Sequence, residues 1–356
     1  MKMGRSLDDL ASEIERQSLA ARDFLAPTRA LSVETAGGVS NLLMPTTGKH
    51  VEEFTISEPA HAQIASKTGL PLKTYRRLQQ DYPNQYDDLV DAILDRESKD
   101  VMARTLDGRL RALVSNRFRA ISHHQIAEAA LQAIYAEHPD MQVASAQITE
   151  TNLYMKFVFP SVTAEVKVGD VIRSGLVVKN SETGHGSIDL ANFYERLACE
   201  NGMVTESLFR KSHLGRPMPV DDDGVASEWF SDETRQADDN VLMMKLGDVV
   251  RGSIADESFQ RTINLLRDST EDVIEGDPAA AVVEVQRQHN LHDGERGSVL
   301  RHLIEGGDLS RYGLIQAVPR TAEDVPSYDR ATELETLGGR ILATTRSDWN
   351  SISTAA

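Results

Sequence analysis

Apolar side chains recur at helical spacing in the first part of the chain. Over residues 7–23, Leu7, Leu10, Ile14 and Leu19 fall on roughly one face, which predicts an amphipathic helix. Residues 60–80 predict two short helices separated by a Gly-Leu-Pro break, the second beginning near Pro71. Other helices are expected over residues 86–97 and 123–138.

Beyond residue 240 the pattern is mainly helical. The predicted segments are 240–270, 277–290, 296–305 and 328–337. Two pairs of adjacent glycines, Gly306-Gly307 and Gly338-Gly339, are expected to act as breaks within this region.

The middle of the chain has the alternation typical of strands. Residues 100–121 predict a hairpin that turns at Asp107-Gly108, and residues 142–180 supply two or three further strands. Another long strand is expected over residues 187–199, with Asn201-Gly202 as a turn of positive backbone angles after it. Because strands and helices do not alternate regularly, we predict an α+β fold with a mixed, mostly antiparallel sheet, flanking helices and a helical C-terminal part.

These patterns divide the chain into four regions. We expect an N-terminal helix and linker over 1–50, an α+β core domain over 51–220, an acidic loop over 221–239, and a mainly helical C-terminal part over 240–345 that packs on the core.

Charge is unevenly distributed along the sequence. The chain has 38 basic and 55 acidic residues, a formal net charge of −17, which counts against nucleic-acid binding by the whole surface. Residues 221–240 nevertheless hold eight of the acidic side chains with only Arg235 opposing them, and residues 104–119 hold five arginines with only Asp107. A local basic face is therefore expected within an acidic protein.

Arginine alternates with an aromatic residue around the predicted hairpin, as on surfaces that bind single-stranded nucleic acid. The helix pair at 60–80 also has the spacing of a helix-turn-helix, whose second helix would carry basic residues. The predicted nucleic-acid-binding residues are Lys73, Arg76, Arg77, Arg109, Arg111, Arg117, Phe118 and Arg119. The alternatives are that the arginines pair with the many carboxylates of the chain, and that the two helices are an ordinary packed pair.

Candidate chemistry elsewhere is sparse. A single cysteine, Cys199, excludes an internal disulfide and is either a nucleophile assisted by His185 or His213 or a small buried residue. The glycines around His185 suit a hairpin turn better than a phosphate-binding loop. The adjacent His123 and His124 lack a cluster of further ligands at metal-site spacing. We therefore assign no catalytic residue, metal or cofactor.

The termini and the apolar runs bear on location. The N-terminus has no signal-peptide pattern, and no apolar run approaches the ~20 residues of a membrane span. A cytoplasmic protein without membrane contact is expected.

Three separated segments resemble a family of phage and plasmid proteins built on domain of unknown function 932. They are RALVSNRFRAI from Arg111, NSETGHGSIDLANFYERLACENGMV from Asn180, and SRYGLIQAVPR with ELETLGGRIL between Ser310 and Leu342. The distribution of that family among mobile elements implies work on the DNA of the element or against host defences.

The residues and the resemblance together favour a DNA-metabolism protein that binds single-stranded DNA, with annealing or protection as the candidate activities. Such proteins commonly assemble as rings or filaments of one subunit, so a homo-oligomer joined by the N-terminal helix is expected. One alternative is a protein-interaction module of a mobile element, such as an acidic, DNA-mimicking inhibitor of a host factor. Another is an enzyme that uses His185, Glu195, Cys199 or His213 in an unrecognised arrangement.

Overall fold

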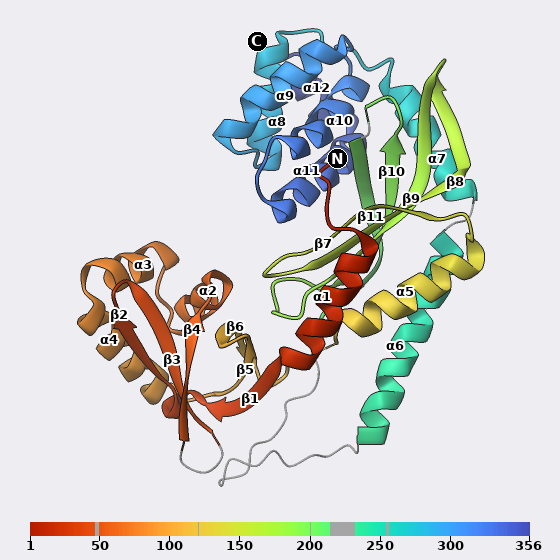
Figure 1. The fold of residues 1–356 in the computed structure, drawn as a ribbon. Helices are drawn as coiled ribbons and strands as arrows, with labels where there is room; N and C mark the ends of the chain where they lie inside the picture. Colours follow the sequence, from red (N-terminus) through yellow and green to blue (C-terminus); the bar gives the residue numbers. More distant parts are fainter. Residues whose placement is uncertain (47–49, 120, 200, 214–231, 254–255) are drawn as a thin grey trace.

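The protein folds into two units, each built around one sheet (Figure 1). The computed structural model describes residues 1–46, 50–119, 121–199, 201–213, 232–253 and 256–356. The predicted α+β class is confirmed, because the strands pair almost wholly antiparallel and helices dominate the last third of the chain.

The first unit is a mixed sheet covered on one face by three helices. Its strands are β1 (Arg22–Pro27), β2 (Ser32–Ala36), β3 (Val39–Thr46), β4 (His50–Ile56), β5 (Asp100–Leu106) and β6 (Arg109–Ser115), with a 3-10 turn η1 (Thr28–Ala30). Its helices are α2 (Glu58–Lys67), α3 (Leu72–Asp81) and α4 (Pro83–Arg96). The strand order is β1-β5-β6-β4-β3-β2. Among the described strands only β4 and β6 run parallel; the crossover that a parallel pair needs is supplied by the three helices, which lie between β4 and the β5–β6 hairpin in the chain.

The start of the chain differs from the prediction. The helix α1 (Leu7–Ala20) is present, but the region expected to end it, from Arg22, is strand β1, which pairs with β5. Residues 1–50 are therefore not a helix and linker, since they also supply β2 and β3. Helical spacing in the first turns did not show that the next residues would be stabilised by pairing with a strand 80 residues away.

The second unit is an antiparallel sheet with helices on both faces. Its strands are β7 (Gln142–Ile148), β8 (Leu153–Lys167), β9 (Asp170–Asn180), β10 (Ile188–Arg196) and β11 (Asn201–Lys211), in the order β11-β10-β9-β8-β7. Its helices are α5 (His123–Glu137), α6 (Asp232–Ser253), α7 (Asp256–Ser269), α8 (Pro278–His289), α9 (Asp293–Gly306), α10 (Arg311–Arg320), α11 (Tyr328–Leu342) and α12 (Arg346–Ser353), with a 3-10 turn η2 (Thr321–Glu323). Apolar residues of α1, α5 and α6 share one core with the sheet, and those of α7 to α12 form a second core with it.

The first unit is inserted in the second along the chain. Helix α1 packs with α5 and β7 of the second unit. The first sheet is formed by residues 22–115, which follow α1 and precede α5 in the chain. Because β1 pairs with β5 and β5 with β6, both antiparallel, the chain enters beside Thr105 and leaves beside Val101.

The acidic region also differs in part from the prediction. Residues 221–231 of the expected acidic loop lie outside the described residues, whereas residues 232–239 begin helix α6.

Glycine has different roles at the predicted breaks. Gly307 ends α9 at φ 68°, as expected, but Gly338 and Gly339 lie inside α11. A side chain at Gly339 would place its Cβ 2.1 Å from the carbonyl oxygen of Val204 on β11. A Cβ at Gly338 would lie 2.5 Å from Pro319 of α10. Gly339 therefore permits close packing of α11 on the sheet and Gly338 close packing on α10, and neither interrupts the helix.

The predicted turn at Asn201-Gly202 is also absent. Both residues begin β11, where Asn201 pairs with Arg196 and Gly202 with Glu195. A Cβ at Gly202 would lie 2.2 Å from the ring of Phe193, so this glycine also serves close packing.

A buried ion pair joins the second sheet to α11. Lys156 on β8 and Glu335 on α11 are both completely buried and are bonded to each other, and Lys156 Nζ lies 4.8 Å from the ring centre of Tyr328. Removing one partner of a buried pair leaves an uncompensated charge, whereas replacing both does not.

We expect Lys156→Met to lower the free energy of unfolding by about 3–5 kcal/mol. The double change Lys156→Met/Glu335→Leu should recover most of that loss, because no buried charge is left. Urea denaturation followed by circular dichroism measures Lys156→Met, Glu335→Leu and the double variant. A double variant that is as unstable as the two single losses added together would show that the pair itself, rather than its imbalance, stabilises the protein.

Candidate functional site

The hairpin of β5 and β6 lies where the first unit meets the second (Figure 1). Its turn has Asp107 at φ 51° and Gly108 at φ 74°, as the predicted two-residue turn requires. Asp107 accepts two hydrogen bonds from Arg16 of α1, at 2.9 and 3.0 Å, and Arg109 pairs with Glu150 at 3.1 Å. The tip of the hairpin is therefore held against the second unit by exposed ion pairs.

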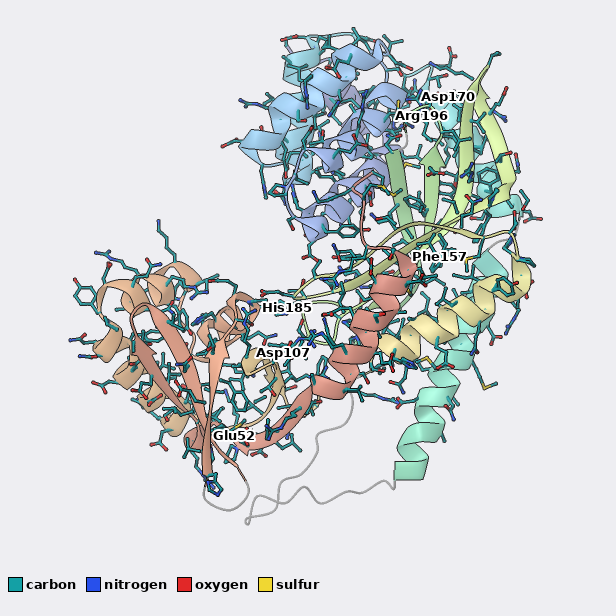
Figure 2. All side chains as sticks on the ribbon, viewed as in Figure 1. Glu52, Asp107, Phe157, Asp170, His185 and Arg196 are labelled. Carbon is teal, nitrogen blue, oxygen red and sulfur yellow. The ribbon has the colours of Figure 1, made fainter. Side chains whose placement is uncertain are left out.

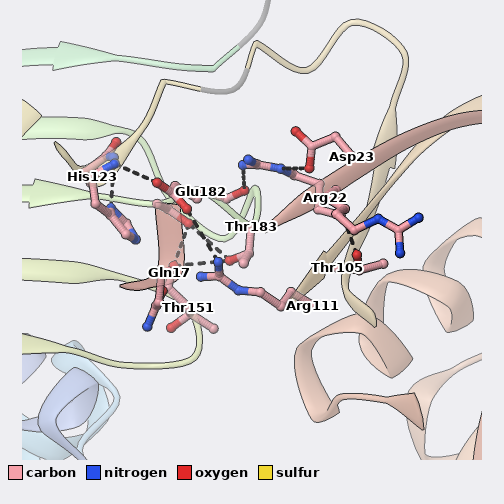
Figure 3. A network of polar contacts seen from close by, with 12 residues as sticks. Gln17, Arg22, Asp23, Thr105, Arg111, His123, Thr151, Glu182 and Thr183 are labelled. Atoms are coloured by element: carbon pink, nitrogen blue, oxygen red, sulfur yellow. Dashed lines mark hydrogen bonds and ion pairs between the residues drawn. The ribbon is translucent and has the colours of Figure 1, made fainter. Parts of the chain in front are cut away.

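Glu182, in the connection between β9 and β10, is the centre of a buried polar network (Figure 3). Its carboxylate accepts hydrogen bonds from the backbone N–H of His123, at 2.6 Å, and from Nη1 of Arg111, at 3.4 Å. Its carbonyl accepts one from Arg104 Nη1, and Arg104 Nε also donates to Asp23 at 2.9 Å. Two arginines of the predicted basic face thus bind the same residue inside the protein.

The electrostatics of the network follow from burial and charge. Burial alone would raise the pKa of Glu182, but His123 with its backbone amide and the guanidinium groups of Arg104 and Arg111 together lower it. Burial lowers the pKa of Arg111, and burial lowers the pKa of His123 to about 4, so that imidazole is neutral at pH 7. Arg111 and Glu182 consequently form an internal ion pair shielded from solvent.

The clasp segment, residues 180–187, is bonded both to the first unit and to the rest of the second. Gln63 of α2 donates to the carbonyl of Thr183 at 2.7 Å and accepts from the backbone N–H of Leu113 at 2.7 Å. The hydroxyls of Ser181 and Thr183 both donate to the carbonyl of Thr151, at 2.7 and 3.1 Å. The glycine-containing stretch is the hairpin connection that the sequence favours, and its polar side chains are used within the protein.

Phe118 is not free to stack on bases, contrary to the prediction. The side chain is only 6% exposed and packs with Met102, Ala112 and Val114. Its ring is stacked on His213 with 5.3 Å between the ring centres. The residue therefore belongs to the core between the units.

The two arginines that flank Phe118 have different surroundings. Arg119 forms an ion pair with Asp239 of α6, and its backbone N–H donates to the carbonyl of His213 at 2.8 Å. Arg117 is exposed, and no hydrogen-bond or ion-pair partner is seen for it among the described residues. Of the predicted hairpin cations, Arg117 is the one that keeps an unpaired charge at the described surface.

The predicted helix pair is formed by α2 and α3, with Gly69 at φ 69° in the turn between them. Lys73 and Arg77 lie on the exposed side of α3, where Arg77 is only weakly paired with Asp81 at 3.5 Å. Arg76 instead turns toward the protein and binds Glu58 and Gln79. Two of the three predicted cations of this helix therefore face solvent.

A buried polar chain fixes the orientation of α3. His61 Nδ1 lies 2.9 Å from the hydroxyl of Tyr75, to which the hydroxyl of Tyr86 donates at 2.5 Å. Burial, together with the nearby charge of Arg76, lowers the pKa of His61 to about 3. The inner face of α3 is thus bonded to α2 and α4, which leaves its outer face exposed.

The residues of the enzyme alternative do not form one site. Cys199 follows β10 at the end where Arg196 pairs with Asn201, whereas His185 and His213 lie beyond the other end, where Ile188 pairs with Lys211. Nine residues of β10 span roughly 27 Å at the rise of a strand. Figure 2 shows Arg196 and His185 well separated in this way. Because of this separation, neither histidine can act as a base for the thiol. Glu195 is itself paired with Arg173 at 3.1 Å.

Sequence reasoning missed Glu182 and Gln63 as the residues that join the units. Glu182 lies among hydroxyl and glycine residues in a hairpin connection, a context typical of an exposed turn. Its two arginine partners are more than 70 positions away, so no local pattern indicated the pairing.

Two features are absent from the described residues. No three His, Cys, Asp or Glu side chains in the described ranges lie close enough together to hold a metal ion. Within the same ranges, no helix is both long and apolar enough to pass through a membrane.

Comparison with known proteins gives no match: no protein-family model, no curated protein and no solved structure is similar to this chain. The resemblance to proteins built on domain of unknown function 932 therefore stays a prediction from the three sequence segments.

We expect Arg111→Met to lower the free energy of unfolding by about 3 kcal/mol, because it leaves the buried carboxylate of Glu182 short of one partner. Arg117→Met, six positions along the chain, should change it by less than about 0.5 kcal/mol, because its side chain is exposed. Urea denaturation of the two variants measures the difference. Equal effects would mean that the buried pair does not contribute to stability.

Acidification should weaken the same network through His123. The pKa of this histidine falls from 6.5 in the unfolded chain to about 4 in the folded protein. Between these values the unfolded chain binds a proton that the folded protein does not, so stability is lost as the pH falls from about 6.5 to 4.

Replacing His123 by Gln should make the slope of stability against pH shallower in this window, by up to about 1.4 kcal/mol per pH unit. The exposed neighbour His124 provides the control, and His124→Gln should keep the wild-type slope. Denaturation curves at pH 7, 6 and 5 compare the slopes. Identical slopes for the wild-type protein and His123→Gln would argue against a neutral buried imidazole.

Proposed function

We propose that the protein binds single-stranded DNA through the outer face of α3. The observation that carries the proposal is the exposure of Lys73 and Arg77 on α3, together with the exposed Tyr82 that caps the C-terminal end of this helix. Lys73 and Arg77 are four residues apart and therefore lie on the same side of the helix. Tyr82 is 50% exposed. Cations beside an exposed ring are the components of a surface that binds phosphates and stacks a base.

Asp81, at the end of α3, pairs with Arg77 at 3.5 Å, but two acidic side chains of the neighbouring helix α4 are engaged elsewhere. Asp87 and Asp91 of α4 accept hydrogen bonds from the backbone N–H groups of Thr35 and Val33, each at 2.8 Å. Their carboxylates are therefore directed to β2 and partly neutralised. The basic face of α3 is accordingly less opposed by α4 than the composition of that helix suggests.

Binding of this kind needs no nucleophile and no metal. Lys73 and Arg77 would contact phosphates and release counterions, and the ring of Tyr82 would stack on a base of any identity. Because the whole chain has a net charge of −17, long-range repulsion limits affinity and makes binding strongly dependent on salt. The proposal thus specifies a DNA-metabolism protein of a phage, plasmid or integrated element that anneals or protects single strands in the cytoplasm.

Assembly into a homo-oligomer is part of the same proposal. Leu10 and Ile14, the centre of the apolar stripe of α1, are buried within the chain against the second unit. Subunit contacts through α1 would therefore use Leu7 and Leu19, which stay exposed.

A protein-interaction module is the second candidate, and one observation favours it. On α6, Val241 and the 69% exposed Met244 lie three residues apart, in a helix that follows the acidic region. An exposed apolar pair on one helix face suits a protein partner better than DNA. The pairing of Asp239 with Arg119 argues in the other direction, because it removes one acidic charge from a DNA-mimicking surface.

We expect Lys73→Gln/Arg77→Gln to weaken binding of a fluorescent single-stranded oligonucleotide and to reduce the slope of log affinity against log salt by about 0.7 for each lost phosphate contact. The control is Arg29→Gln/Arg96→Gln, which removes two exposed cations of the same unit and should leave the slope unchanged if only α3 contacts phosphates. Fluorescence anisotropy over a salt series measures both.

A separate variant tests the role of the Tyr82 ring. Tyr82→Ala should cost about 1–3 kcal/mol of binding free energy and leave the salt slope unchanged, because stacking releases no counterion. Preference for duplex DNA over a single strand would instead assign α3 to groove recognition. A wild-type protein that binds no nucleic acid at low salt would exclude the proposal and leave the protein-partner candidate.

A further inference from the structure

A small cavity opens between the β10–β11 turn and the helices α9 and α10, away from α3 and in the other unit. Its polar lining consists mainly of Arg196, Cys199, Asn201, His302, Gln316 and Arg320. Two of these side chains are cationic, and the lining also contains the single thiol of the chain.

The two arginines are held differently. Arg196 Nε and Nη2 bind the two carboxylate oxygens of Asp170 at 2.7 and 2.8 Å, which fixes the guanidinium and leaves Nη1 3.4 Å from Cys199 Sγ. The hydroxyl of Tyr312 also donates to Asp170, at 2.8 Å. Figure 2 shows Arg196 and Asp170 together at this end of the sheet. Arg320 is half-buried, and no partner for its guanidinium is seen among the described residues. The cavity therefore has an uncompensated positive charge beside a fixed donor.

Two deeply buried side chains in the lining have unused polar atoms. Asn201 is 2% exposed and donates through Nδ2 to Gln316, but its Oδ1 is buried without a hydrogen-bond partner. His302 is 8% exposed, and its Nε2 lies 2.8 Å from Asp324; its Nδ1 has no hydrogen-bond partner, and the nearest carboxylate, that of Glu305, is 3.6 Å away. Buried polar atoms are nearly always bonded in folded proteins, so these two indicate a group that supplies a donor.

We propose that this cavity binds a small organic acid that carries a hydrogen-bond donor next to its carboxylate, as α-amino and α-hydroxy acids do. The carboxylate binds Arg320 and Nη1 of Arg196, for which a planar acid is well matched. The neighbouring amino or hydroxyl group donates to Asn201 Oδ1. Inorganic phosphate can also bind the two arginines, but its hydroxyl lies on the same phosphorus as its charged oxygens and not on a neighbouring carbon, so it reaches Asn201 Oδ1 less well while the arginines hold those oxygens.

The remaining acidic group of the lining does not oppose an anion. Asp308 pairs with Lys167 at 2.8 Å and accepts from the hydroxyl of Ser310. Its charge is therefore balanced outside the cavity, and the charge available to a ligand is that of Arg320.

Cys199 makes the cavity directly measurable, because it is the single cysteine of the chain and is partly exposed. The experiment follows the rate at which an aromatic disulfide reagent modifies Cys199 in the full-length protein, with glycine, glycolate or inorganic phosphate added over a concentration series. We expect glycine or glycolate to slow modification several-fold and phosphate to have less effect. Arg320→Gln should abolish the protection, whereas Arg296→Gln, which removes an exposed cation of α9, should retain it.

Thermal unfolding with the same additives gives a second readout that does not depend on the thiol. A bound acid raises the midpoint with concentration in the wild-type protein and in Arg296→Gln but not in Arg320→Gln. Absence of both protection and a midpoint shift overturns the proposal, as does an equal response of Arg320→Gln. Protection by phosphate alone overturns the assignment of an organic acid. None of these outcomes depends on whether α3 binds DNA.

Discussion

Desolvation of one carboxylate determines how the two halves of this protein meet. Glu182 is buried between the sheets, and a buried charge is tolerated only when its partners are present and correctly placed. Those partners come from β5, β6 and the start of α5, so the hairpin and the helix must adopt one position relative to the connection that carries Glu182. The hydrogen bonds of Gln63 add a second restraint that involves no charge.

This constraint changes how the basic residues should be understood. Arginines near residue 110 have the composition of a nucleic-acid surface, yet Arg111 pairs with the carboxylate of Glu182. Arg104 binds the carbonyl of Glu182 and pairs with Asp23, and Arg119 binds α6. In a chain with an excess of acidic residues, internal pairing is a strong competitor for every arginine. Among the predicted binding residues, the cations that remain for a ligand are Arg117 and the two on the exposed face of α3.

The sequence was informative where structure is local. The turn at Asp107-Gly108, the helices from α2 to α5 and the α+β class follow from periodicity and turn chemistry, which act over a few residues. It was uninformative where contacts are distant. Arg119 and Asp239 are 120 positions apart, and the requirement for Gly339 arises from the backbone of β11. Phe118 was assigned to a binding surface because its neighbours are charged, but its burial depends on His213 in another unit. Such partners can be seen only when the chain is folded.

The insertion of the first unit limits how it can move. The chain enters beside Thr105 and leaves beside Val101, points roughly 13 Å apart along β5 at the rise of a strand. A unit attached at two separated points rotates most easily about the line that joins them. It resists rotation about any other axis. The bonds from Gln63 to Thr183 and from Arg109 to Glu150 oppose rotation about that line. A ligand that pulls on α3 would therefore act on the second sheet by rotating the first unit about this line. The path of the chain fixes the axis of that rotation.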